Sequence, residues 1–300
     1  MLYLCIPSHD EAATVGLLLW KIRKTFQAFP REYEILVADD ASSDTTADVL
    51  EPYAKVLPLT IVRHGDRHGY ARSLEALLRL AVERTDRPKR DAVIVMHADF
   101  AHGPEYLPEL VKRLEGGSDI VTTEATLAGQ PSRGIRWVRQ GARFLLRGVS
   151  VPGVRDICSG FTAYRLMSVK SALRAQAGPL LTTDGWTANA ELLARVACHA
   201  RRIDVVPVVE RHDLRPRASR LEAWPLANLK RVGDCDSGCG SRGVHQRRVG
   251  GRRVVGDQRG AERRERDPHD VTSSSSWSSA DRGAAARRPS VLREIGRAHV

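Results

Sequence analysis

Apolar and polar residues alternate in blocks along the first 125 residues of the chain. Short apolar runs are typical of buried strands, whereas apolar positions three or four residues apart are typical of amphipathic helices. The short runs predict strands at residues 2–7, 33–38, 59–62, 91–96 and 119–123. The spaced apolar positions predict helices between them, at residues 11–26, 43–53, 70–82 and 104–114.

Strands separated by helices of this length predict an α/β fold with a mostly parallel sheet and right-handed crossovers. In such sheets, ligands bind beyond the carboxyl ends of the strands. Polar side chains at the points where the predicted strands end are therefore candidate ligand contacts.

Three of the predicted strands end in acidic segments, which read PSHDE (7–11), DDASSD (39–44) and HAD (97–99). A single Asp at such a position is often a helix cap, which is the role expected of Asp44. Grouped carboxylates repel one another unless a cation or a donor-rich ligand balances them. Asp39, Asp40 and Asp99 therefore predict a binding site at this edge of the sheet.

Two common nucleotide motifs are missing from the sequence. No G-x-G-x-x-G follows the first strand, and no G-x-x-x-x-G-K-[ST] occurs anywhere, which disfavours a dinucleotide fold and a P-loop. An edge rich in Asp rather than Gly favours a nucleotide held through its ribose and base, with a divalent ion on the diphosphate.

Composition divides the chain near residue 228. The whole chain carries a net charge of +11, and residues 231–300 alone contain 15 Arg, no Lys and 9 acidic residues. That segment has a single Leu and a single Ile, too little apolar surface to offset chain entropy. Residues 229–300 are thus predicted to be a disordered tail, or the product of a GC-rich gene translated out of frame, since every cation of residues 231–300 is Arg.

Cysteine use and hydropathy bear on location. The five Cys do not form a disulfide framework pattern, and the lone C-x3-C at Cys235 and Cys239 is weak evidence for zinc. No signal peptide precedes LYLCIP, and no apolar run reaches the ~18 residues of a membrane span. The expected location is cytoplasmic, either free or held peripherally at the cytoplasmic face of a membrane.

Five segments, in order along residues 2–222, resemble motifs of family 2 glycosyltransferases, in particular the polyprenyl/dolichyl-phosphate mannosyltransferase branch. IPSHDEAATV is similar to the P-x-Y-N-E opening, LVADDASSDTT to V-D-D-G-S-x-D-G-T, and MHADFAHGPEYLPEL to M-D-A-D-x-x-H-P-P-E. DICSGFTAYR resembles D-x-x-S-G-F-R-x-Y-R, and IDVVPVVERHDLRPRASRL resembles the closing strand and basic loop. The resemblance implies a GT-A (nucleotide-diphospho-sugar transferase) fold over residues 1–228.

The resemblance also implies a donor site for a nucleoside diphosphate sugar. It assigns nucleotide contacts to Pro7, His9 and Glu11, and the base edge to Asp40 with Asp39 in support. His97, Ala98 and Asp99 occupy the Asp-x-Asp position. Asp99 would ligate Mg²⁺ or Mn²⁺ on the diphosphate, and His97 would face the ribose.

The implied reaction is inverting transfer of the sugar, with a polyprenyl phosphate as the expected acceptor. Asp156 would face the acceptor, and Glu191 would support the acceptor wall. Arg215 and Arg220 would bind the donor diphosphate or the acceptor phosphate, with Arg211 and Arg217 as competitors. A phosphate is already a nucleophile, so no strong base is needed. A hydroxyl acceptor would require one, with Asp156 or Asp184 as candidates.

The chain also departs from the family pattern. His97 replaces the first Asp, Ala101 replaces a Gln found in some members, and Ala41 and Thr45 replace two Gly. The Arg that follows the fifth strand in close relatives is missing, and the substitute stays open among Arg133, Arg136 and Arg139.

The segment 63–72 resembles the family's R-x-N-x-G-x-G-x-A loop. It is expected to turn at Gly69 and to present a helix N-terminus to an anion.

Two other classes of function stay open from the sequence. The departures at His97 and Ala101, with the missing Arg, favour a catalytically weakened module that binds a sugar nucleotide. The Arg-rich tail favours a nucleic-acid-binding protein, whose binding would be salt-sensitive and confined to the tail. No nucleic acid is expected to bind the core.

Overall fold

The computed structural model describes residues 1–127, 151–185 and 187–210, with the backbone alone at residues 125–127 and 210. The predicted tail and several predicted basic residues lie outside the described residues, namely Arg133, Arg136, Arg139, Arg211, Arg215, Arg217 and Arg220.

The described residues form a seven-stranded sheet with the order β3-β2-β1-β4-β6-β5-β7. Its strands are β1 (Leu2–Ser8), β2 (Tyr33–Asp40), β3 (Leu59–His64), β4 (Ala92–Val95), β5 (Ile120–Leu127), β6 (Thr162–Arg165) and β7 (Ile203–Glu210). Strands β1 to β4 pair in parallel, as do β5 and β7, and β6 runs antiparallel to both of its neighbours. The predicted mostly parallel sheet is confirmed.

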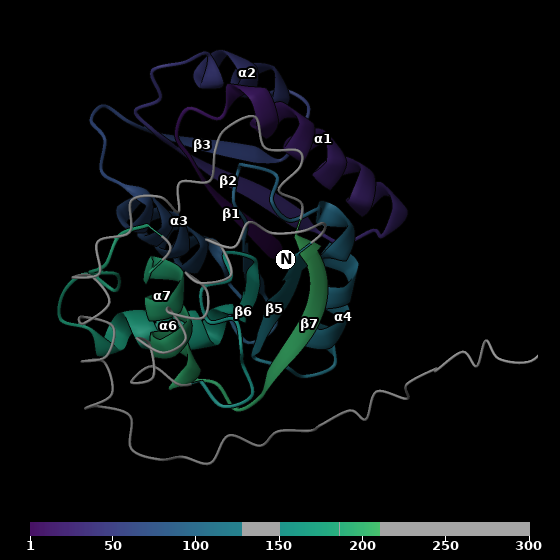
Figure 1. Ribbon diagram of the computed structural model, residues 1–300, viewed down its shortest axis with the longest axis vertical. Helices are drawn as coiled ribbons and strands as arrows, with labels where there is room; N and C mark the ends of the chain where they lie inside the picture. The colour runs from purple at the N-terminus through teal and green to yellow at the C-terminus, as the bar shows by residue number, and fades with distance from the viewer. Residues whose placement is uncertain (128–150, 186, 211–300) are drawn as a thin grey trace, which may run out of the picture. The chain divides into compact units, whose positions relative to one another are not determined.

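Helices cover both faces of the sheet (Figure 1). They are α1 (Ala12–Ala28), α2 (Thr46–Ala54), α3 (Tyr70–Arg84), α4 (Leu107–Glu115), α6 (Leu166–Ala175) and α7 (Thr187–Ala197), with the 3₁₀ turn η1 (Pro104–Tyr106) before α4. Among the described helices, none combines the length and apolar character that crossing a membrane requires.

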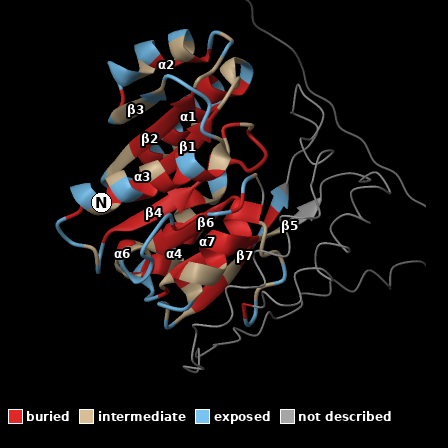
Figure 2. Cartoon of the chain, turned by 90° about the vertical axis from the view of Figure 1, so that its left-hand side faces the viewer, coloured by how far each residue is buried: buried red, intermediate tan, exposed pale blue. Residues whose placement is uncertain are grey.

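The two faces of the sheet have separate apolar cores, because alternate side chains of a strand point to opposite faces. In β1, Leu4 and Ile6 pack in the core that contains α1 and α4, whereas Tyr3 and Cys5 pack in the core that contains α3, α6 and α7. Strands β1 and β4 and the last six residues of β2 are buried (Figure 2), so their ends are rigid supports for the loops that follow.

The short strand β6 joins the two parallel parts of the sheet, β3-β2-β1-β4 and β5-β7. It pairs antiparallel between β4 and β5, and the Thr162 hydroxyl lies 3.0 Å from that of Thr122. Because β6 runs opposite to β4, its first residues lie at the edge where β4 ends. The preceding residues Ser159 and Gly160 therefore approach the loop that follows β4.

Candidate functional site

The candidate site lies at the edge of the sheet where β1, β2, β3 and β4 end. Since these four strands are parallel, their last residues share one edge, and the loops that follow carry most of the predicted site residues. Parallel sheets bind their ligands at this edge.

Backbone strain is concentrated in these loops. Among the described residues, three that are not glycine have positive φ, namely Asp10 (53°), Ala41 (52°) and Phe100 (61°). They follow β1, β2 and β4 respectively. Such residues cost of order 1–3 kcal/mol each and persist where the surrounding structure fixes them, which is typical of functional sites. The strain therefore marks the same edge as the grouped carboxylates.

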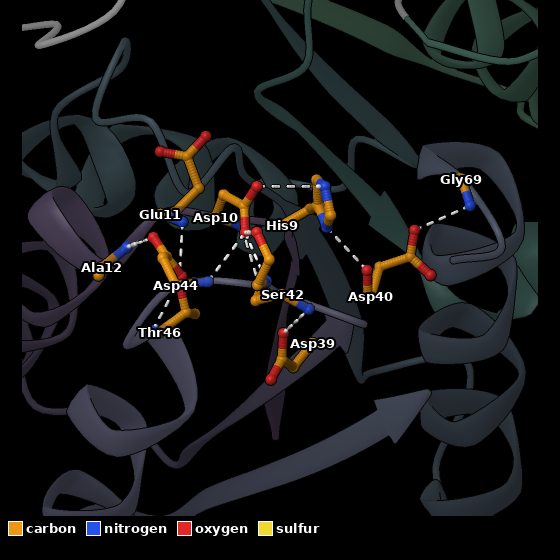
Figure 3. Close-up of polar contacts among 11 residues, drawn as sticks. His9, Asp10, Glu11, Ala12, Asp39, Asp40, Ser42, Asp44, Thr46 and Gly69 are labelled. Carbon is orange, nitrogen blue, oxygen red and sulfur yellow. Dashed lines mark hydrogen bonds and ion pairs between the residues drawn. The ribbon is translucent and has the colours of Figure 1, made fainter. Parts of the chain in front are cut away.

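The loops after β1 and β2 hold each other through two carboxylates (Figure 3). Asp10 Oδ1 accepts hydrogen bonds from the N–H groups of Ser43 (2.7 Å) and Asp44 (3.3 Å). Asp44 in turn accepts from the N–H of Ala12 at the start of α1 (3.2 Å) and of Thr46 at the start of α2 (2.9 Å). Thr45 rather than Asp44 is the N-cap of α2, but the Asp44 carboxylate satisfies the first N–H group of both helices.

Asp40 fixes the loop that leads into α3. Its buried carboxylate accepts hydrogen bonds from the N–H groups of His68 and Gly69, both at 2.8 Å, and from Nδ1 of His64 at 2.9 Å. Burial opposes ionisation of Asp40, but these hydrogen bonds outweigh it and hold the pKa of the carboxyl below its usual value. The Nδ1–H of His9 donates to the Asp40 carbonyl at 2.8 Å, which joins the β1 loop to the same point.

The other residues predicted to contact the nucleotide belong to the same strands and to the loops that follow them. Asp39 is buried, and its Oδ1 accepts from the N–H of Ser42 at 3.2 Å. Pro7 is part of β1, Glu11 precedes α1, and the Ala98 methyl packs in the apolar core. Their contacts with a nucleotide stay predictions.

The start of α3 faces carboxylates of the protein itself, which corrects the expectation of an open anion site there. Besides Asp40 on Gly69, Asp184 Oδ1 accepts from the N–H of Ala71 at 3.1 Å. These anions satisfy N–H groups that have no partner within the helix and favour its positive end. Gly69 turns the chain at φ 91°, as expected, and a Cβ there would lie 2.7 Å from Asp184 Oδ2.

His97 packs against α3 and α7. Its ring stacks on Tyr70 with centroids 5.1 Å apart, and its Nε2 lies 3.3 Å from Nδ2 of Asn189. The Tyr70 hydroxyl donates to Oδ1 of Asn189 at 2.7 Å, so the amide NH₂ faces His97 and Nε2 is the acceptor. A Cβ at Gly160 would collide with the ring, so glycine there makes room for His97. Its predicted contact with a ribose stays a prediction.

Asp99 occupies the loop after β4 and is half-buried. Its Oδ1 accepts from the N–H of Ala101 at 3.0 Å, and the left-handed Phe100 between them closes this tight turn. Carboxylate oxygen suits Mg²⁺ and Mn²⁺, and Mg²⁺ is commonly held by one or two carboxylates together with substrate phosphates. The donor atoms of Asp99 therefore fit the expected ion. Asp156 is half-buried and precedes β6 in the chain.

Glu191 is a structural residue, and its predicted support of the acceptor wall stays a prediction. It is fully buried on α7 and accepts from the N–H groups of Thr182 and Thr183, both at 2.9 Å. Arg195 Nη2 lies 2.8 Å from its carboxylate. These contacts fix the segment that carries Asp184.

Sequence reasoning missed four residues of this edge. His64 and His68 lie with Asp40 in a group whose ligand atoms are all within 4.8 Å of one another. Their H-x3-H spacing was the available signal. Tyr70 and Asn189 had none, because Asn189 is 92 residues from His97.

Comparisons with known proteins identify the family and support the fold. The family model described as Glycosyl transferase family 2 matches residues 3–173. The dolichol-phosphate mannosyltransferase of Pyrococcus furiosus is 29% identical over 167 residues, which cover 53% of this chain and 45% of that protein. The undecaprenyl-phosphate mannosyltransferase of Micrococcus luteus is 28% identical over 210 residues, which cover 68% of this chain and 80% of that protein. The chain thus spans less than half of the first relative.

A solved structure supports the fold. Glucosyl-3-phosphoglycerate synthase from Mycobacterium tuberculosis, in complex with Mn²⁺, uridine-diphosphate-glucose and phosphoglyceric acid, has a TM-score of 0.50 at 17% identity. The similarity covers 78% of this chain and 76% of that chain. With the matching family, it confirms the predicted GT-A fold.

Proposed function

The chain belongs to glycosyl transferase family 2, and we propose that it transfers a sugar from a nucleoside diphosphate sugar to a polyprenyl phosphate. One observation carries the proposal. Asp99 lies in a strained turn at the sheet edge where the loops after β1, β2 and β3 are tied together by Asp10, Asp40 and Asp44. The chemistry of this edge supports the nucleoside diphosphate sugar as donor. The names of the two relatives support a polyprenyl phosphate as acceptor.

The donor would lie across the loops after β1, β2 and β4. We assign its nucleotide to Pro7, His9, Glu11, Asp39, Asp40, His97 and Ala98, following the family motifs. The hydrogen bonds among Asp10, Ser43 and Asp44 keep these loops in place before the donor arrives. A site that is organised in advance needs no rearrangement when charge develops on the leaving group.

Asp99 would hold Mg²⁺ or Mn²⁺ together with the donor diphosphate. The ion, when bound, neutralises charge that builds on the departing nucleoside diphosphate. Support comes from the carboxylate chemistry of Asp99 and from the Mn²⁺ named with the mycobacterial structure. The Ala101 N–H orients the Asp99 carboxylate through Oδ1.

Transfer itself would be a direct displacement. An oxygen of the acceptor phosphate forms a bond to the anomeric carbon, and the bond from that carbon to the nucleoside diphosphate breaks with its electron pair. The configuration at the anomeric carbon is therefore inverted, and no proton has to be removed. Of the two candidate bases, Asp184 is engaged at the start of α3, and Asp156 is assigned to acceptor recognition.

Acceptor recognition is proposed for Asp156, with Arg215 and Arg220 as contacts of the phosphate. Arginine binds phosphate through paired N–H groups. A lipid acceptor would bring the chain to the cytoplasmic face of a membrane.

A transfer assay tests the proposal. The purified full-length chain is incubated with a panel of nucleoside diphosphate sugars, undecaprenyl phosphate and Mn²⁺ or Mg²⁺, and the lipid-linked sugar is measured. Asp99→Asn should lower turnover at least ~100-fold, the loss expected when one preorganised electrostatic partner is removed. Folding should be preserved, because an Asn oxygen can accept the same hydrogen bond from Ala101.

Two variants serve as controls for Asp99→Asn. Asp86→Asn changes an exposed carboxylate before the opposite end of β4 and should keep full activity. His97→Ala should lower turnover much less than Asp99→Asn, since His97 is assigned to the ribose. Equal losses at positions 97 and 99 would contradict the assignment. Donor binding without turnover by the unaltered chain would support the weakened binding module, and His97→Asp should then restore activity.

A further inference from the structure

We propose that Asp40, His64 and His68 form a second metal site, which binds a transition-metal dication of the Zn²⁺ class. Asp40 ends β2, His64 ends β3, and His68 lies in the loop before α3. This site goes beyond the proposed transfer reaction. It shares Asp40 with the proposed nucleotide contacts and is separate from the Mg²⁺ or Mn²⁺ assigned to Asp99.

The spacing of the three side chains fits one ion. Their ligand atoms all lie within 4.8 Å of one another, and Asp40 Oδ1 is 2.9 Å from His64 Nδ1. Ligands held at ~2.1 Å from an ion are about 3.0–3.4 Å apart, so this pair already has nearly the separation required. The rings of His64 and His68 have centroids 4.5 Å apart, and a rotation of the exposed His68 side chain closes the remaining distance.

The donor atoms determine which ion fits. Two imidazoles and one carboxylate suit Zn²⁺, Fe²⁺, Co²⁺ and Ni²⁺, whereas Mg²⁺ prefers oxygen ligands alone. The ion would replace the proton that His64 now donates to Asp40, and binding would therefore release a proton.

The site is largely organised before any ion binds. The N–H groups of His68 and Gly69 hold the Asp40 carboxylate at 2.8 Å, so the same loop fixes one ligand and supplies another. The side chains of Asp40 and His64 are 5% and 11% exposed, whereas His68 is exposed. The protein would thus close one side of the ion, and water would complete its coordination on the other.

Bound metal would link the end of β2 to the loop before α3. His9 is hydrogen-bonded to the Asp40 carbonyl, so the ion would also stiffen the region assigned to the nucleotide. An ion that binds the folded state alone raises stability in proportion to the logarithm of its concentration above Kd.

Zinc titration of the tag-free full-length chain, without nucleotide, tests this site. Both arms carry Cys235→Ser and Cys239→Ser, so that the thiols of the C-x3-C segment do not compete. We expect Zn²⁺ to bind and to raise the thermal unfolding midpoint, with Co²⁺ giving a ligand-field absorption and Mg²⁺ giving no comparable shift. His68→Ala should weaken binding at least ~10-fold, as expected for loss of a contact that supports a metal.

The matched control is His199→Ala, which removes an exposed imidazole in the segment that enters β7, at the other edge of the sheet. It should bind Zn²⁺ as tightly as its parent, and His68→Ala should keep the metal-free unfolding midpoint. Equal zinc affinity in His68→Ala and its parent, or equal losses at positions 68 and 199, would overturn the proposal. Asp99→Asn should leave zinc binding unchanged, so failure of this site and failure of the proposed transfer are separate results.

Discussion

At the scale of single residues, Ala41 shows the cost of a substitution within a family motif. The related motif has Gly at this position, and Ala41 keeps the left-handed conformation (φ 52°) that Gly adopts freely. Its neighbours Asp40 and Ser42 are both fixed by hydrogen bonds to other segments. The chain therefore holds a strained alanine rather than changing the path of the loop.

We expect Ala41→Gly to raise the free energy of unfolding by about 0.5–1 kcal/mol. Relief of the left-handed conformation, roughly 1–2 kcal/mol, exceeds the greater chain entropy of Gly in the unfolded state. Urea unfolding measures the change. Ala76→Gly, in the middle of α3, is the matched control and should lower stability by ~1 kcal/mol. Destabilisation by both variants would contradict the strain argument.

At the scale of elements, local patterns predicted most of the first half of the fold. The strands and helices expected before residue 125 are present, because their apolar spacing directly reflects burial on one or two faces. The antiparallel β6 was not expected, since TAYR has only four residues and no apolar run. The strand-end carboxylates were predicted from local position. The packing of His97 against Asn189 was not, because it depends on where distant elements meet.

This packing predicts the effect of a single methyl group at the start of β6. Gly160→Ala should displace the His97 ring, because the added Cβ would occupy its place beside Tyr70 and Asn189. We expect weaker donor binding and at least ~10-fold lower turnover, since small displacements in a site reduce rates strongly. Donor affinity and transfer rate measure it.

Gly178→Ala is the matched control for Gly160→Ala. A Cβ at Gly178 would meet nothing within 4 Å, so this variant should retain both donor affinity and turnover. Unchanged donor affinity and rate in Gly160→Ala would show that the His97 position does not matter to the reaction.

At the scale of the whole molecule, the sequence predicts where the strand-end carboxylates lie but not the hydrogen bonds that join their loops. Asp39, Asp40 and Asp99 could be placed at one edge because parallel strands bring their ends together. Asp10 and Asp40 accept hydrogen bonds from loop residues up to 34 positions away, next to left-handed turns. No local sequence pattern predicts these contacts. Several carboxylates at this edge thus hold chain segments together, besides any contact that they make with a ligand.

The hydrogen bonds to these carboxylates predict how the free energy of unfolding depends on pH. For Asp10, Asp40 and Asp44, burial opposes ionisation, but hydrogen bonds from the loops outweigh it and hold the pKa of each carboxyl below its usual value near 3.8. Between the ordinary pKa and the lower folded pKa, the unfolded chain binds more protons than the folded chain, so stability falls as pH falls. The stabilisation is fully present above about pH 5 and is lost below about pH 4. Urea unfolding in chelator, from pH 7 to 3, should show this decline, and Asp40→Asn should make it shallower while Asp86→Asn does not. An equally steep acid decline in Asp40→Asn would mean that this carboxylate does not hold the loops together.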